Sequence, residues 1–187
     1  MIVTAKIYHE ITISGFGGQG IVLNGSILGK AAAIYDKTNA TFVQSYGPEA
    51  RGGACSAQVI VSDTIISYPY VHQPSILIAM SQEGYESNID SIKDGGMLLT
   101  DSDLVKQRDV GKRYLSYSIP ASRIAEKMGN KMMANIVMLG FLASFSNVVT
   151  TESLKKAIFD SVPKGTEEKN LGAFEAGYEY GSKEKQG

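Results

Sequence analysis

Three glycines with the spacing Gly-x-Gly-x-x-Gly follow an apolar segment near the N-terminus. They lie in the hexapeptide Gly15-Phe16-Gly17-Gly18-Gln19-Gly20. Such a loop lets a strand turn sharply into a helix and lets the backbone come close to a ligand. The first N–H groups of that helix have no intrahelical partner, and with the helix dipole they favour an anion. The spacing therefore predicts a site for a phosphate or carboxylate group.

The hexapeptide alone does not make a dinucleotide site. Such a site also uses an acidic residue about 20 positions further on, at the end of the second strand, to hold the ribose. We expect that strand over residues 39–44, with Asp36 before it and Glu49 a further turn after it. Neither carboxylate stands where the ribose requires it, so we expect a non-nucleotide use of the loop in preference to NAD binding. The alternative is that the glycines only let the helix pack closely on the strand.

A second glycine-rich loop follows the second strand and reads Tyr46-Gly47-Pro48-Glu49-Ala50-Arg51-Gly52-Gly53. Arg51 stands beside two glycines, so little side-chain bulk surrounds its guanidinium group. A guanidinium group in such a place can bind a carboxylate or phosphate at two points. Arg51 can equally pair with Glu49 and stiffen the loop, and the sequence favours neither role.

Polar residues stand at the ends of several predicted strands, where open α/β sheets place their ligand sites. These residues are Ser14, Ser45, Ser81 and Asp101. Ser and Asp are also common helix caps, and for Ser81 and Asp101 we expect capping. Asn135 lies in the strongly apolar stretch 131–145, where an unpaired amide would be costly. It either bonds to backbone near the Gly15 loop or faces a partner protein.

The hydrophobic pattern predicts strands that alternate with helices along the chain. We expect strands over residues 6–14, 39–44, 55–61, 75–80, 97–100 and 113–118, with a short one at 65–66. We expect helices over residues 18–35, 81–92, 121–128 and 131–145, one beginning at 150, and a last one over 164–181. The loop between the second and third strands is too short for a crossover helix, so these strands should pair antiparallel. The predicted fold is a Rossmann-like three-layer α/β sandwich with a mostly parallel sheet and at least one antiparallel strand pair.

The bulk composition is that of an ordinary globular protein, with 43% hydrophobic residues and a net charge of −1. We expect one domain over residues 1–187, with a polar tail at 182–187. No basic region would attract nucleic acid or an anionic membrane, and no apolar run approaches the roughly 20 residues of a membrane helix. The N-terminus does not read as a secretory signal, so we expect a cytoplasmic protein. A single cysteine, Cys55, excludes an internal disulfide or a cysteine-ligated iron–sulfur cluster held by this chain alone.

Taken together, the motifs resemble the gamma subunit of 2-oxoacid:ferredoxin oxidoreductases. The resemblance rests on the two glycine-rich loops, on Pro74-Ser75-Ile76-Leu77-Ile78-Ala79-Met80-Ser81-Gln82-Glu83, and on residues 135–140 and 169–177. It covers nearly the whole chain and is far more specific than the glycine spacing alone. The Tyr-Gly-Pro-Glu-Ala-Arg-Gly-Gly form of the second loop is similar to the 2-oxoglutarate branch of the family.

The resemblance implies one subunit of a complex that oxidatively decarboxylates 2-oxoglutarate to succinyl-CoA. Thiamine diphosphate, Mg²⁺ and iron–sulfur clusters would be held by alpha, beta and delta subunits, with ferredoxin or flavodoxin as electron acceptor. This chain would close the active site and help to bind coenzyme A. The resemblance identifies no metal-binding or catalytic residue in this chain. The implied contact residues are Gly15, Gly17, Gly18, Gln19, Gly20, Tyr46, Gly47, Glu49 and Arg51. An independent Rossmann-type nucleotide-binding protein and the related indolepyruvate oxidoreductase subunit are the alternatives.

Overall fold

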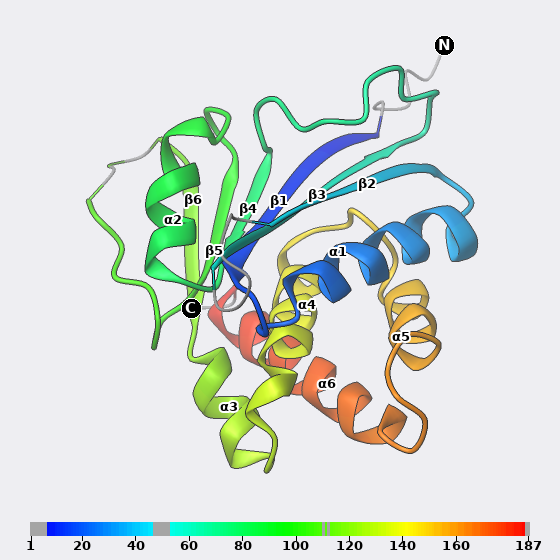
Figure 1. The fold of residues 1–187 in the computed structure, drawn as a ribbon, viewed down its shortest axis with the longest axis vertical. Coiled ribbons are helices and arrows are strands. Elements are labelled where there is room, and N and C mark those ends of the chain that lie inside the picture. The colour runs from blue at the N-terminus through cyan, green and yellow to red at the C-terminus, as the bar shows by residue number, and fades with distance from the viewer. Residues whose placement is uncertain (1–6, 47–52, 110, 112, 186–187) are drawn as a thin grey trace.

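The computed structural model describes residues 7–46, 53–109, 111 and 113–185. Within them a six-stranded sheet runs through the molecule in the order β2-β3-β1-β4-β5-β6 (Figure 1). Its strands are β1 (Tyr8–Phe16), β2 (Asn39–Tyr46), β3 (Ala54–Ser62), β4 (Ile76–Ala79), β5 (Met97–Asp101) and β6 (Leu115–Ile119). The pairs β1–β4, β4–β5 and β5–β6 are parallel, whereas β3 lies antiparallel to both β1 and β2. The predicted antiparallel pairing of the second and third strands is confirmed, and β3 adds a second antiparallel pair with β1.

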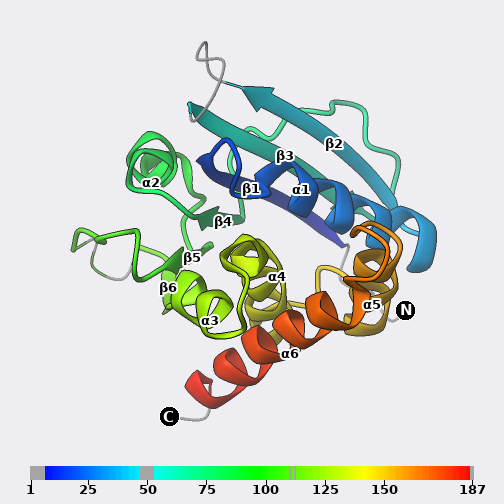
Figure 2. The same cartoon turned by 60° about the horizontal axis from the view of Figure 1, so that its bottom comes forward.

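Helices cover both faces of the sheet, which makes the predicted three layers. One face carries α1 (Ile21–Lys30), α3 (Ala121–Lys127), α4 (Ala134–Phe145), α5 (Thr151–Phe159) and α6 (Glu167–Glu184). The other face carries α2 (Gln82–Asn88), as Figure 2 shows. Two separate hydrophobic cores result, because neighbouring strand residues point to opposite faces. Ile78 of β4 packs into the larger core with α1 and α4, while Leu77 packs with Tyr85 of α2.

The differences from the predicted element boundaries include three at the first helix, at residues 65–66 and at the last helix. The first helix begins at Ile21, because residues 18–20 form a turn in which Gly18 and Gly20 have positive φ. No strand forms at residues 65–66, since both edges of the preceding β3 are already paired with β1 and β2. The last helix, α6, starts at Glu167 and continues to Glu184, beyond the predicted end at 181.

The helices α4 and α6 pack against each other at unusually close range. α4 is apolar on all sides and almost entirely buried, and none of the helices in the described residues is long and apolar enough to cross a membrane. Glycines on both helices permit the contact: a methyl group on Gly140 would overlap the carbonyl oxygen of Phe174, and one on Gly177 would overlap that of Val137. The position of α6, and of the residues that lead into it, therefore depends on the absence of side chains at the crossing.

Asp36 joins the end of the first helical segment to the start of α5. The segment continues from α1 as a π-helical turn, Ala31–Tyr35, and Asp36 follows it. Its carboxylate accepts hydrogen bonds from the backbone N–H of Thr150 at 2.7 Å and from the hydroxyl groups of Thr150 and Ser153 at 2.7 and 2.6 Å. Partial burial raises the pKa of Asp36, whereas the hydrogen bonds from Ser153 and Thr150 lower it. Together the hydrogen bonds outweigh burial, so the pKa lies below its ordinary value of 3.8.

Asp36→Ala is expected to lower the free energy of unfolding by about 1–2 kcal/mol near neutral pH, because it leaves the start of α5 without its acceptor. The pKa of Asp36 is lower in the folded than in the unfolded chain. Its contribution is therefore present above the unfolded pKa and disappears as the pH falls through the folded one. Urea unfolding of both proteins at a series of pH values should show the difference shrinking below about pH 3.8. A difference that is constant down to the acid end of the series would contradict this role.

Candidate functional site

The glycine loop lies at the carboxyl end of β1 and leads directly into α1 (Figure 1). Gly18 and Gly20 have φ of +97° and +73°, values that favour glycine. Gly15 serves a different purpose, because a methyl group there would lie 2.7 Å from Cδ1 of Ile21. The start of α1 thus packs directly on the end of β1, but Gly15 permits this contact, whereas the fingerprint spacing gave that role to Gly20, which instead lies against Asn135.

The side chain of Gln19 holds this loop together. Its Oε1 accepts a hydrogen bond from the backbone N–H of Phe16 at 2.6 Å, and its Nε2 donates to the carbonyl oxygen of Met80 at 2.8 Å. Both ends of the amide are therefore occupied by the protein's own backbone. Gln19 therefore fixes the shape of the loop and connects it to the end of β4, and its amide group has a structural role in the loop.

The start of α1 is well suited to an anion. The first α-helical hydrogen bond joins the N–H of Asn24 to the carbonyl oxygen of Gly20 at 3.0 Å, so the N–H groups of residues 21–23 precede it. No side chain caps this terminus, and no acidic residue lies in its first turn. The helix dipole and the N–H groups therefore act together without a neighbouring negative charge to oppose them.

Asn135 connects the glycine loop to the start of α4. Its side chain is only 2% exposed, and its Nδ2 donates to the carbonyl oxygen of Gly20 at 3.3 Å. The backbone oxygen of Asn135 in turn accepts from Nδ2 of the buried Asn24 at 2.8 Å. Of the two roles that the sequence left open for Asn135, the structure shows the bond to backbone at the glycine loop. The two hydrogen bonds fix the starts of α1 and α4 relative to each other.

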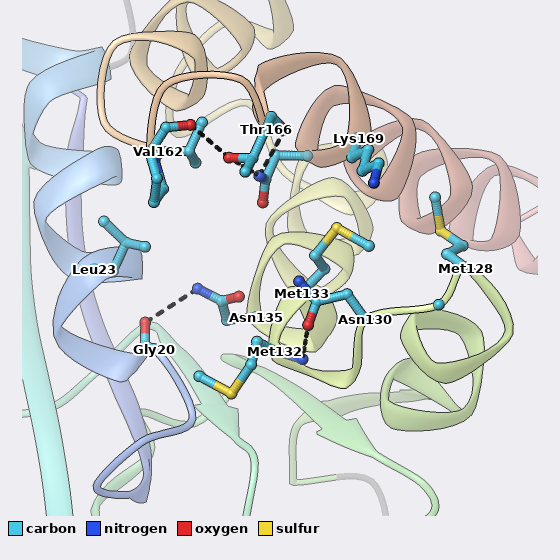
Figure 3. Close-up of a pocket in the computed structure, with 13 residues that line it drawn as sticks. Gly20, Leu23, Met128, Asn130, Met132, Met133, Asn135, Val162, Thr166 and Lys169 are labelled. Carbon is cyan, nitrogen blue, oxygen red and sulfur yellow. Dashed lines mark hydrogen bonds between the residues drawn. The ribbon is translucent and has the colours of Figure 1, made fainter.

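A hollow of about 450 Å³ opens beside this junction, as Figure 3 shows. It lies between the start of α1, residues 128–135, and residues 162–170 ahead of and within α6. Its apolar walls include Leu23, Met128, Met132, Met133 and Val162, and its polar groups include Asn130, Asn135, Thr166, Lys169 and Asn170. The sequence did not predict this hollow, because methionines around a Gly-Asn turn are typical of core packing. The only sequence signal was Lys169-Asn170, which also suits a solvated helix end.

A smaller hollow of about 260 Å³ shares Met132 with the first. Gly18, Gln19 and Met80 line it on the loop side, and Lys131 and Ser122 line it on the other. Met132, which is 62% exposed, stands between the two hollows. The glycine loop is therefore flanked by recessed surface on the side of α3 and α4.

The second predicted loop emerges at the same edge of the sheet as the first. Tyr46 ends β2 with its side chain 63% exposed, and the backbone N–H of Gly17 donates to the carbonyl oxygen of Gly53 at 3.0 Å. The ends of the two loops are thus in direct contact. Gly47, Glu49 and Arg51 lie outside the described residues.

Two of the other polar residues at strand ends, Ser81 and Asp101, have structural partners. Ser81 caps α2 by accepting a hydrogen bond from the N–H of Gly84 at 3.0 Å. The buried Asp101 accepts from the N–H and hydroxyl of Ser122 at 2.9 and 2.6 Å, at the start of α3. Capping by Ser81 and Asp101 is therefore confirmed.

Cys55 is buried on β3, and burial raises the pKa of its thiol, which disfavours the nucleophilic thiolate.

Comparison with known proteins places this fold and loop in a family. Residues 10–180 match the family model described as pyruvate ferredoxin/flavodoxin oxidoreductase. The chain belongs to this family. It is 53% identical over 176 residues to the 2-oxoglutarate synthase subunit KorC of Methanocaldococcus jannaschii, an alignment that covers 93% of this chain and 94% of that one.

Two solved structures of the family have the same fold. The gamma subunit of a keto/oxoacid ferredoxin oxidoreductase from Geobacter sulfurreducens is 40% identical, with a TM-score of 0.82 over 92% of this chain and 98% of that chain. The 2-oxoglutarate:ferredoxin oxidoreductase of Magnetococcus marinus, solved with 2-oxoglutarate, coenzyme A and succinyl-CoA bound, is 25% identical with a TM-score of 0.86. The match covers 96% of this chain but 32% of the Magnetococcus chain. The resemblance that the motifs suggested, and the predicted fold, are confirmed.

Proposed function

We propose that this chain is the gamma-type subunit of a 2-oxoglutarate:ferredoxin oxidoreductase, which oxidatively decarboxylates 2-oxoglutarate to succinyl-CoA and reduces ferredoxin or flavodoxin. The observation that carries this proposal is the 53% identity to a 2-oxoglutarate synthase subunit over nearly the full length of both chains. The chain would act with alpha, beta and delta subunits in the cytoplasm and would not be active alone.

The redox and thiamine chemistry would then belong to those partner subunits. A cysteine-ligated cluster needs several thiolates, and this sequence has one cysteine, which is buried. In the part of the chain that the structure describes, no three His, Cys, Asp or Glu side chains gather as a metal site would require. These donor sets do not fit an iron–sulfur cluster, and thiamine diphosphate, Mg²⁺ and the clusters are assigned to the other chains.

Coenzyme A is the ligand that we assign to the glycine loop. Its diphosphate suits the start of α1, where N–H groups and the helix dipole face outward with no acidic residue in the first turn. Gly15, Gly17, Gly18 and Gly20 shape this cradle, and Gln19 fixes it. The second loop, with Tyr46, Gly47, Glu49 and Arg51, follows β2 and would supply further contacts to the ligand. Support comes from the related Magnetococcus marinus enzyme, whose structure holds coenzyme A.

Purification of the tagged chain from its native cell tests the subunit assignment. We expect other oxidoreductase subunits to accompany it, and the resulting complex to reduce ferredoxin with 2-oxoglutarate only when coenzyme A is present. Parallel assays with pyruvate and indolepyruvate separate the branches of the family. Oxidation of a substrate by the chain alone, or tight retention of a pyridine nucleotide by it, would contradict the proposal and favour the independent nucleotide-binding protein.

Arg51→Ala is expected to raise the KM for coenzyme A about tenfold in the assembled complex, because a charge-assisted contact to phosphate would be lost. Steady-state kinetics at saturating 2-oxoglutarate measure this effect. Glu49→Ala is the matched variant: if Arg51 pairs only with Glu49, both substitutions should affect stability alike and leave the KM unchanged. An unchanged KM in Arg51→Ala would remove Arg51 from the site.

A further inference from the structure

The strand β2 is an edge of the sheet that its own sequence does not protect. It lies at the end of the strand order, with β3 on one side and none of the described strands on the other (Figure 2). A free edge presents unpaired N–H and C=O groups to other chains, and proteins block it with a charge, a proline, a bulge or a very short strand. β2 is eight residues long, contains neither a charged residue nor a proline, and pairs with β3 without a break in register. It therefore has the properties of a strand that binds another strand.

Aromatic side chains flank this edge on both faces of the sheet. No residue of β2 is buried, whereas six of the nine residues of β3 are. Phe42 lies against α1 and is still 37% exposed. Thr41 points to the opposite face, where its hydroxyl donates to the carbonyl oxygen of Pro69 at 3.2 Å. The rings of Tyr68 and Tyr70, on either side of Pro69, pair at a centroid distance of 5.4 Å, and both are more than half exposed.

The other edge of the sheet, β6, is less open. It is five residues long, and its last residue is buried. The hydroxyl of Ser116 donates to the side chain of Gln107 at 2.6 Å, and the ring of Tyr117 stacks on Phe145. β2 is thus the longer and the more exposed of the two edges.

The residues of β2 suit pairing with an identical strand. A twofold axis perpendicular to the sheet makes two copies of an edge strand antiparallel and keeps each face of one strand beside the same face of the other. Phe42 then meets residues of its own face, and Thr41 and Val43 meet residues of theirs. Aromatic and β-branched residues are favourable neighbours across strands, and like charges are the unfavourable ones. Since β2 carries no charge, the pairing of two copies brings no like charges together.

We propose that β2 is a dimerisation strand. Two copies of this chain pair their β2 strands antiparallel about an axis near Phe42 and Val43, which joins two six-stranded sheets into one. A single strand pair is marginal in water, so the contact also needs apolar surface. The exposed rings of Phe42, Tyr68 and Tyr70 supply that surface beside the edge. The inference concerns the arrangement of subunits and does not depend on the proposed reaction.

Sedimentation equilibrium of the purified full-length chain tests the proposal. We expect a mass of twice 20.1 kDa at micromolar concentration. Val43→Lys places ammonium groups of the two copies close together and should raise the dimer dissociation constant about tenfold or more. Val43→Glu should do the same, and an equimolar mixture of the two variants should dimerise again, because opposite charges then meet. A monomeric wild-type chain, or variants that stay monomeric when mixed, would overturn the proposal.

Leu115→Lys is the matched control, because Leu115 is an exposed apolar residue of the opposite edge strand, β6. It should leave the dimer intact, and dissociation equal to that of Val43→Lys would mean that the β2 edge does not decide the association. A strand of another subunit is the competing occupant of this edge. If the wild-type chain is monomeric and Val43→Lys instead prevents recovery of other oxidoreductase subunits from the native cell, the edge binds that subunit and the dimer is wrong. Reduction of ferredoxin with 2-oxoglutarate tests the proposed function separately from either result.

Discussion

Gly177→Ala is expected to lower the free energy of unfolding by about 3 kcal/mol and the melting temperature by about 6–12 °C. The added methyl group would overlap the carbonyl oxygen of Val137 and lie 2.8 Å from its carbonyl carbon. Both atoms belong to the backbone of α4, which no change of side-chain rotamer can move aside. The two helices must separate, and the densely packed core between them loses contacts along its length.

Gly172→Ala is the matched control on the same helix. A methyl group there meets only the terminal carbon of Met128, at an ordinary contact distance of 3.5 Å. Since alanine is the better helix former, this variant should gain about 0.5–1 kcal/mol. Urea and thermal unfolding of both variants should therefore give changes of opposite sign. A loss of similar size at both positions would mean that helix propensity and not the close crossing decides the stability.

The sequence predicted the parts of the fold that local pattern determines. Alternating strands, the glycine turn and the short β2–β3 loop each carry their signal within a few residues. The insertion of β3 between β1 and β2 was not predicted, because the sequence around β3 does not indicate which strand pairs with its second edge. The short segment at 65–66 was wrongly assigned for the same reason: its composition suits a strand, but no unpaired edge is left beside β3.

The site was predictable in its loop and not in its surroundings. Gly15, Gly17 and Gly20 revealed the loop by their spacing. The structure shows a geometric need for Gly15 and Gly20, and a second positive φ at Gly18, which lies outside the spacing. The role of Gln19 depends on Met80, 61 positions away, and that of Asn135 on Gly20, 115 positions away. The hollow is assembled from three separate segments, and its methionines look like core residues in the sequence.

Gly20→Ala is expected to damage stability and the site together. With φ at +73°, an alanine here costs about 1–2 kcal/mol from backbone strain alone. Its methyl group would also lie 2.7 Å from Cγ of Asn135, which displaces the buried amide from its hydrogen bond to Gly20 at a further cost of about 1–2 kcal/mol. We expect a total loss of about 3 kcal/mol and, in the assembled complex, a KM for coenzyme A raised at least about tenfold.

Gly95→Ala separates these two effects. Gly95 has nearly the same backbone conformation, with φ at +75°, but a methyl group there has no neighbour within 4 Å. Gly95 precedes β5, at the end of the sheet opposite the carboxyl strand ends where the glycine loop lies. The substitution should therefore cost only the backbone strain and leave the KM for coenzyme A unchanged. The difference in unfolding free energy between the two variants then measures the contact of Gly20 with Asn135. Equal losses, with an unaltered KM in both, would show that the Asn135 amide moves aside freely and that the start of α4 does not hold the loop in place.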